Sequence, residues 1–135
     1  ALIRAIHKAE ALTENNTRLH FNIAVNYGGH WDILEVVRKL ARQIENQELT
    51  SDDITQDLFE KELSLGSAPF PDLFIRTSGE QRISNFLIWQ LAYTELYFTD
   101  RFWPDFDENE LFKALEFYKQ RERRFGCTTE QVSFH

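Results

Sequence analysis

The spacing of hydrophobic residues along the chain predicts five helices. They are expected at residues 1–12, 32–46, 55–63, 85–93 and from about 107 to 123. The second is the most regular, because its hydrophobic residues fall on a single stripe of the helical surface. Asp32, with Glu35 three residues later, has the pattern of a capping box at its start, and Asp105 or Asp107 is expected to cap the last helix.

Three other stretches have the composition of β-strands. Residues 19–25 alternate between apolar and polar side chains, residues 73–75 are uninterrupted by polar ones, and residues 95–99 are rich in aromatic side chains. An unbroken apolar strand is typical of a sheet covered on both faces. Strands that alternate with helices indicate an α/β fold with a parallel sheet. Three strands are few for such a sheet, so part of the domain is expected outside this sequence.

The composition fits one globular domain and narrows what the chain can bind. The chain has 135 residues, of which 42% are hydrophobic and 27% are charged. Its net charge of -7 argues against general binding to nucleic acids or anionic membranes, which requires a positive field. The single cysteine, Cys127, excludes an internal disulfide and fits a reducing compartment. No apolar run approaches the ~20 residues of a membrane span.

The stretch that begins at Arg76 is the strongest candidate site. Its sequence is RTSGEQRIS, which holds two arginines, three hydroxyl side chains and a glycine suited to a tight turn. Ligands of parallel sheets bind at the carboxyl ends of the strands. Ser84 is expected to cap the helix at residues 85–93, whose N-terminus would attract anions. These features predict a diphosphate site whose donors are the side chains of Arg76, Thr77, Ser78, Arg82 and Ser84.

The arginine stretch and three further candidates each have a plainer interpretation, which the residues leave open. The two arginines could pair with Glu80, Glu95 and nearby aspartates. The stretch NYGGHWD, residues 26–32, lacks the G-x-G-x-x-G pattern of dinucleotide sites and is more typical of a turn into a helix. Glu95 could pair with a site arginine or bind Mg²⁺ together with ligands from elsewhere. The basic cluster RERRFG, residues 121–126, could simply compensate a helix dipole.

Taken together, these motifs resemble those of a known enzyme family. The resemblance rests on NYGGHWD, on DLFIRTSGEQRISNFLIWQLAYTELYFTDRFWPDFDE from residue 72, and on RERRFG. This combination closely resembles the cis-prenyltransferases, and within them the bacterial undecaprenyl diphosphate synthases. It extends from about residue 10 to residue 126. No P-loop motif, which would favour a phosphate-binding enzyme of another kind, is present in the sequence.

The resemblance implies a Rossmann-like parallel sheet flanked by helices, in a homodimer. Such enzymes use Mg²⁺ to add isopentenyl diphosphate units in cis to farnesyl diphosphate, and the product is a lipid carrier for cell-wall sugars. By motif, Arg76, Arg82 and Ser84 correspond to the isopentenyl diphosphate clamp, and Glu95 to an acidic residue linked to Mg²⁺. The remaining site residues implied by the resemblance are Asn26 and Gly28 near the active site, Arg124 and Gly126 in an R-x-G element, and Leu19 in the product tunnel.

One family signature, D-G-N-G-R-W with its metal-binding aspartate, is absent from the sequence. The resemblance therefore implies that residues 1–135 form the C-terminal part of a single domain, with residues 127–135 as a loose tail. Such a piece is expected to be inactive alone and to expose apolar surface. The expected location is the cytoplasm, near the inner membrane face where the lipid product resides. A non-catalytic partner subunit of a prenyltransferase is the alternative function.

Overall fold

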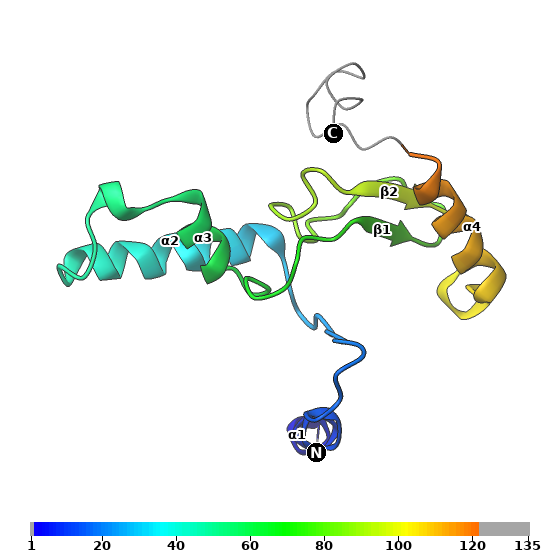
Figure 1. Ribbon diagram of the computed structural model, residues 1–135, viewed down its shortest axis with the longest axis horizontal. Coiled ribbons are helices and arrows are strands. Elements are labelled where there is room, and N and C mark those ends of the chain that lie inside the picture. Colours follow the sequence, from blue (N-terminus) through cyan, green and yellow to red (C-terminus); the bar gives the residue numbers. More distant parts are fainter. Residues whose placement is uncertain (1, 122–135) are drawn as a thin grey trace.

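The computed structural model describes residues 2–121, which form four α-helices and two β-strands (Figure 1). Two short 3-10 helices, η1 (Ser51–Asp53) and η2 (Trp103–Asp105), lie between the longer elements. The helices and strands, in chain order, are α1 (Leu2–Thr13), α2 (Gly29–Glu45), α3 (Gln56–Glu62), β1 (Leu73–Arg76), β2 (Glu95–Phe98) and α4 (Glu108–Lys119).

The two strands form a parallel pair, as the alternation of strands and helices predicts. Leu73 lies opposite Glu95 and Arg76 lies opposite Phe98, so both strands end at the same edge. The strands expected at residues 73–75 and 95–99 are thus confirmed to within one residue. All four β1 residues are half-buried, so residues 2–121 do not cover this strand on both faces as its apolar sequence predicts.

The main hydrophobic cluster lies between α2 and α3. Val36 and Leu40, from the predicted stripe of α2, pack with Leu63 just after α3. Thr55 caps α3 by accepting a hydrogen bond from the Leu58 N–H at 3.2 Å. Figure 1 shows these two helices side by side, apart from the strands. This cluster fixes α2, and the first residues of the helix bond Asn85 in the segment between β1 and β2.

Helix α4 packs against strand β2. Asp107 begins the helix as its N-cap and accepts a hydrogen bond from the Glu110 N–H at 3.0 Å, which settles the choice between the two predicted caps. Ala114 is completely buried, and the rings of Phe117 and Tyr97 lie 5.3 Å apart. The helix therefore packs against β2 through one face, while its other residues are exposed.

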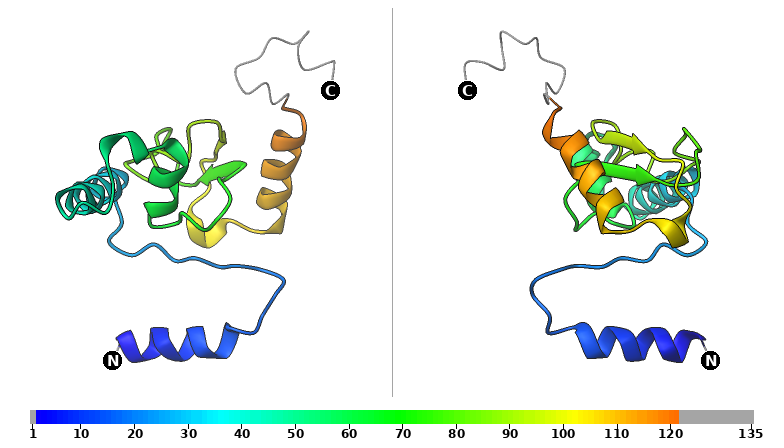
Figure 2. Two further views of the ribbon diagram at one scale, coloured as in Figure 1. Left: turned by 60° about the vertical axis from the view of Figure 1, so that its left-hand side comes forward. Right: turned by 90° about the vertical axis from the view of Figure 1, so that its right-hand side faces the viewer.

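The amino-terminal segment lies apart from the rest of the molecule (Figure 2). No residue of α1 is buried, although its predicted bounds are confirmed to within about a residue. The strand predicted at residues 19–25 is wrong, because these residues form no strand and Leu19 and Phe21 remain 75% and 79% exposed. An alternating pattern forms a strand only beside a partner, and none of residues 2–121 pairs with this segment.

The helix predicted at residues 85–93 is also wrong. The chain runs there through successive turns, with N–H groups of Phe86 and Leu91 donating to the carbonyls of Ile83 and Leu87. Asn85 and Leu87 have φ angles of 61° and 44°, which a right-handed helix does not allow. The apolar content of this stretch produces burial, at Leu87 for example, without helical geometry. None of the described helices is both long enough and apolar enough to cross a membrane.

Candidate diphosphate-binding site

Residues 76–85, here called the arginine loop, begin at the carboxyl end of β1. The Nη1 atom of Arg76 donates to the Ser84 Oγ at 2.6 Å and to the carbonyl oxygen of Arg82. These bonds fold the far end of the loop back onto the strand end. The structure therefore brings three predicted site residues, Arg76, Arg82 and Ser84, into one place, with Arg82 and Ser84 exposed and Arg76 half-buried.

The charges of the two arginines are balanced differently. Arg82 forms an ion pair with Glu80 in the same loop, so the plainer interpretation of the arginines holds for Arg82. No carboxylate among residues 2–121 forms an ion pair with Arg76. Within residues 2–121 its guanidinium bonds only neutral oxygens, which leaves a positive charge for an anion at the strand end.

The middle of the arginine loop is fixed against the exit of β2. The N–H groups of Ser78 and Gly79 donate to the carbonyls of Arg101 and Thr99, at 2.7 and 2.9 Å. Gly79 has a φ of 73°, which confirms the tight turn expected there. The Ser78 hydroxyl donates to the carbonyl of Thr77 at 2.6 Å. These amides and the Ser78 hydroxyl are therefore occupied within the protein, and the side chains of Arg76, Arg82 and Ser84 remain the main anion donors.

The helix N-terminus near these side chains belongs to α2 and not to the predicted helix after Ser84. Ser84 accepts from Arg76 instead of capping a helix, which corrects the expected role of its hydroxyl. The N–H of Gly29 donates to the Asn85 carbonyl at 2.6 Å, and the N–H of His30 donates to Asn85 Oδ1 at 2.9 Å. Asn85 thus joins the arginine loop to α2, a contact that sequence reasoning missed.

The stretch around Asn26 and Gly28 lies next to this joint. Asn26 is exposed with a φ of 54°, a conformation that asparagine tolerates better than most residues. Gly28 has extended backbone, but a Cβ atom there would lie 2.8 Å from Asn85 Nδ2. A side chain at position 28 would therefore displace the amide group of Asn85. Asn85 thus brings this stretch beside the arginine loop.

Asp32 does not cap α2 as the sequence predicts, because α2 begins earlier, with Gly28 as its N-cap. The carboxylate is instead 2% exposed. It accepts hydrogen bonds from the Tyr27 hydroxyl at 2.8 Å, the Ser64 N–H at 3.0 Å and the Ser64 hydroxyl at 2.7 Å. Burial and the bond to Asp32 raise the pKa of Tyr27, which stays protonated. Asp32 therefore fixes the turn before α2 against the segment that follows α3.

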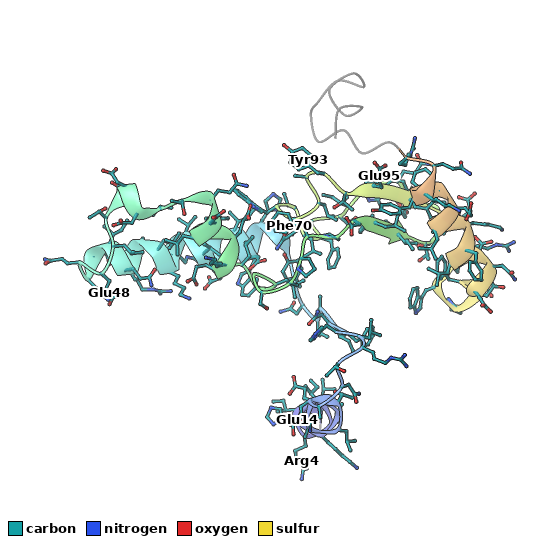
Figure 3. The ribbon with its side chains drawn as sticks, viewed as in Figure 1. Arg4, Glu14, Glu48, Phe70, Tyr93 and Glu95 are labelled. Carbon is teal, nitrogen blue, oxygen red and sulfur yellow. The ribbon has the colours of Figure 1, made fainter. Side chains whose placement is uncertain are left out.

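Glu95 lies at the opposite end of the strands from Arg76. It begins β2 (Figure 3) and is paired with Leu73, three residues or about 10 Å from Arg76 along the strand. Its carboxylate lies 3.5 Å from Arg121 Nε, and the Arg121 guanidinium also lies 4.4 Å from the centre of the Phe117 ring. Glu95 thus pairs with an arginine outside the arginine loop.

The described residues do not hold a set of ligands that suits Mg²⁺. Mg²⁺ takes oxygen ligands in octahedral geometry. Within residues 2–121 no three His, Cys, Asp or Glu side chains come together as a metal site would need. Glu95 alone, with Arg121 beside it, does not fit such an ion. Of the other predicted site residues, Leu19 is exposed outside the site region, while Arg124 and Gly126 lie outside the described residues.

Comparison with known proteins supports the resemblance seen in the sequence. The model of a prenyltransferase family described as "Putative undecaprenyl diphosphate synthase" matches residues 1–126. The chain is 54% identical over 131 residues to a ditrans,polycis-undecaprenyl-diphosphate synthase, (2E,6E)-farnesyl-diphosphate specific, from Aliivibrio fischeri, covering 97% of this chain and 51% of that protein. It is 53% identical over 132 residues to an isoprenyl transferase from Nitrosomonas europaea, with coverages of 98% and 49%.

The fold is similar to that of a solved enzyme structure. Lavandulyl diphosphate synthase from Lavandula x intermedia, in complex with dimethylallyl diphosphate, matches with a TM-score of 0.88 and 48% identity, over 93% of this chain and 54% of that chain. The α/β fold predicted from the sequence is therefore confirmed, with two parallel strands among the described residues. The chain spans about half the length of the curated relatives it matches. Because the family match covers nearly the whole chain, this chain belongs to the undecaprenyl diphosphate synthase family of cis-prenyltransferases.

Proposed function

We propose that this chain carries the isopentenyl diphosphate site of a cis-prenyltransferase that lengthens farnesyl diphosphate to undecaprenyl diphosphate. The observation that carries the proposal is the state of Arg76. Its guanidinium lies at the carboxyl end of a parallel strand, is held by Ser84, and has no carboxylate partner among the described residues. A positive charge placed and left unbalanced in this way suits a diphosphate.

The proposed task of the arginine loop is to hold and orient the second substrate. In prenyl transfer the allylic substrate loses its diphosphate, the alkene of isopentenyl diphosphate attacks the allylic carbon, and a proton is then lost. This sequence needs no covalent nucleophile from the protein. Holding isopentenyl diphosphate by its diphosphate group leaves the alkene free to meet the allylic carbon, which is a contribution of positioning.

The other parts of the whole enzyme belong to the proposal as well. Mg²⁺ would assist the departure of the allylic diphosphate, but Glu95 needs further ligands from outside residues 2–121, so no step of the reaction is assigned to the metal. We expect a homodimer in the cytoplasm whose lipid product enters the inner membrane face. Leu19 would line the product tunnel, and Arg124 with Gly126 would contribute to a substrate site.

A non-catalytic partner subunit is the alternative within the same family. The arrangement of Arg76 and Ser84 supports the catalytic function, because a supporting subunit has no need of an unbalanced arginine at a strand end. The relatives named above also differ in product, since one makes an undecaprenyl chain and another is a lavandulyl diphosphate synthase. The length of the product is therefore the part of the proposal that most needs measurement.

The test uses two proteins, the chain itself and a grafted enzyme. The grafted enzyme replaces the matched part of the Aliivibrio fischeri relative with this chain. Each is incubated with farnesyl diphosphate, Mg²⁺ and labelled isopentenyl diphosphate, and the label in extracted lipid is counted and resolved by chain length. We expect transfer by the grafted enzyme and none by the chain alone. A grafted enzyme that folds and dimerises but transfers no label would favour the non-catalytic subunit as the function of this chain.

A further inference from the structure

The hydrogen bonds between the arginine loop and α2 involve one residue of the loop, Asn85. Gly28, the N-cap of α2, offers no side chain to the first N–H groups of the helix. Asn85 fills this place from 55 residues further along the chain: its Oδ1 accepts the His30 N–H at 2.9 Å and its carbonyl accepts the Gly29 N–H at 2.6 Å. Helix ends normally find such partners locally. Here the partner comes from the loop that carries the arginines.

The position of Asn85 relative to Ser84 gives this contact a second effect. Ser84, the residue before it, accepts the hydrogen bond of Arg76, so the residues that hold the helix and the guanidinium are adjacent. Both have left-handed backbone, with φ angles of 47° and 61°. Serine adopts this conformation with difficulty, whereas asparagine tolerates it. The bonds of Asn85 to α2 therefore hold the backbone that presents Ser84 to Arg76.

We propose that Asn85 is a positioning residue for the diphosphate clamp: by capping α2 it fixes the end of the arginine loop on a rigid helix. This inference rests on the proposed function of the loop. Asn85 touches no reacting atom in this role and acts through Ser84 and Arg76. The N-terminus of α2 is occupied by Asn85, so its first two N–H groups serve the clamp indirectly and do not bind the diphosphate themselves.

The first experiment measures steady-state kinetics of the grafted enzyme with Asn85→Gly. Glycine keeps the left-handed backbone and the carbonyl bond to Gly29, and removes only the side-chain bond to His30. We expect the KM for isopentenyl diphosphate to rise about tenfold, as the loss of one well-placed hydrogen bond predicts, with less than about a twofold change for farnesyl diphosphate. Gln47→Gly, which removes a side chain from another exposed position with a φ of 61° that lies after α2 and outside the arginine loop, is the matched control and should leave both values unchanged.

Two more substitutions separate positioning from general support of the fold. Asn85→Asp keeps an oxygen acceptor at a helix N-terminus, where negative charge is favoured, and should restore most of the loss seen in Asn85→Gly. Gly28→Ala places a Cβ within 2.8 Å of Asn85 Nδ2 and should raise the same KM, but only while Asn85 is present. In the Asn85→Gly background Gly28→Ala should add less than about a twofold effect, because neighbours that share a contact are not additive.

A wild-type grafted enzyme without transfer activity overturns the proposed function, and with it this inference. If the wild type is active but Asn85→Gly leaves the KM for isopentenyl diphosphate unchanged, or lowers kcat without changing this KM, the role of Asn85 alone is overturned. Fully additive effects of Gly28→Ala and Asn85→Gly also overturn it, since Gly28 would then act without Asn85. Faster hydrogen exchange at the His30 amide in Asn85→Gly supports the contact directly, and unchanged exchange contradicts it.

Discussion

The two loops that leave the parallel strands occupy equivalent positions and have opposite chemistry. The arginine loop follows β1 with two arginines and one glutamate, whereas residues 99–107, here called the acidic loop, follow β2 with three aspartates and one arginine. In the acidic loop the charge of Arg101 is balanced within the protein, because its Nε lies 3.6 Å from the buried carboxylate of Glu110 in α4. In the arginine loop Arg76 has no such partner among the described residues. Position at a strand end alone therefore does not make an anion site.

The two loops also support each other. The Thr99 N–H donates to the Arg76 carbonyl at 2.9 Å, and the Ser78 and Gly79 amides donate back to the acidic loop. Each loop thus satisfies the backbone of the other. The acidic loop holds the shape of its neighbour, and the charges that would bind a diphosphate remain on the arginine loop. This division predicts that charge changes in the two loops have unequal effects.

The largest effect is expected from Arg76→Ala in the grafted enzyme. Loss of two charge-assisted bonds to a phosphate group should lower kcat/KM for isopentenyl diphosphate by about two orders of magnitude or more. Asp100→Ala, an exposed change in the acidic loop, is the control and should stay within about twofold. Equal losses in the two variants, measured by label incorporation, would remove the distinction between the loops.

A smaller effect in the opposite direction is expected from Glu80→Gln. This change releases Arg82 from its ion pair and removes a negative charge near the proposed phosphate position. Because exposed ion pairs contribute little, the affinity for isopentenyl diphosphate should rise only about two- to fivefold, and more at low salt. Calorimetric titration at two salt concentrations measures this change. A lower affinity would mean that Glu80 orients Arg82 for the ligand.

The acidic loop should show its own importance in stability. Asp107→Ala removes the N-cap of α4 and should lower the melting temperature of the grafted enzyme by a few degrees, with KM values unchanged. Asp107→Ser keeps an oxygen acceptor and is the matched control. A change in the KM for isopentenyl diphosphate without loss of melting temperature would show that the acidic loop takes part in binding.

The smallest effect is the part of the pH-dependent stability that comes from the acidic loop and α4. The hydrogen bond from the Glu110 N–H lowers the pKa of Asp107, and the hydrogen bond from Lys113 lowers the pKa of Glu110. Groups with lowered pKa values stabilise the fold above their unfolded pKa, so this contribution is complete above about pH 5 and is lost as the pH falls below about 4. Melting curves between pH 3 and 7 should show a shallower decline for Asp107→Asn than for wild type, and equal slopes would contradict this assignment.

Sequence patterns predicted the elements that depend on local chemistry. The two strands are short apolar runs with clear ends, and α2 has a single apolar stripe, so each was located to within a few residues. Segment 19–25 has an equally clear alternation, but its strand would need a neighbour that residues 2–121 do not supply. Residues 85–93 have helix-compatible composition, but positive φ angles at Asn85 and Leu87 interrupt a helix there, and Asn85 accepts hydrogen bonds from α2.

The candidate site was predictable in its residue types more than in its contacts. Two arginines and Ser84 after an apolar strand indicated anion binding, and the structure places them together. The pairing of Arg82 with Glu80 was among the alternatives. The separation of Glu95 from Arg76 follows from the parallel pairing, because Glu95 begins one strand and Arg76 ends the other. Asn85 had a weak signal, since asparagine tolerates positive φ, but nothing local revealed its partner 55 residues away.

The buried carboxylate of Asp32 also limits how sequences of this family can diverge. The carboxylate accepts hydrogen bonds from the Tyr27 hydroxyl and from the N–H and hydroxyl of Ser64. Each of these donors would lose its partner if the carboxylate were replaced. An unsatisfied buried polar group is costly, so single replacements at these three positions are expected to be rare. In an alignment of relatives, positions 27, 32 and 64 should therefore change together, as a covarying set that spans the turn before α2 and the segment after α3.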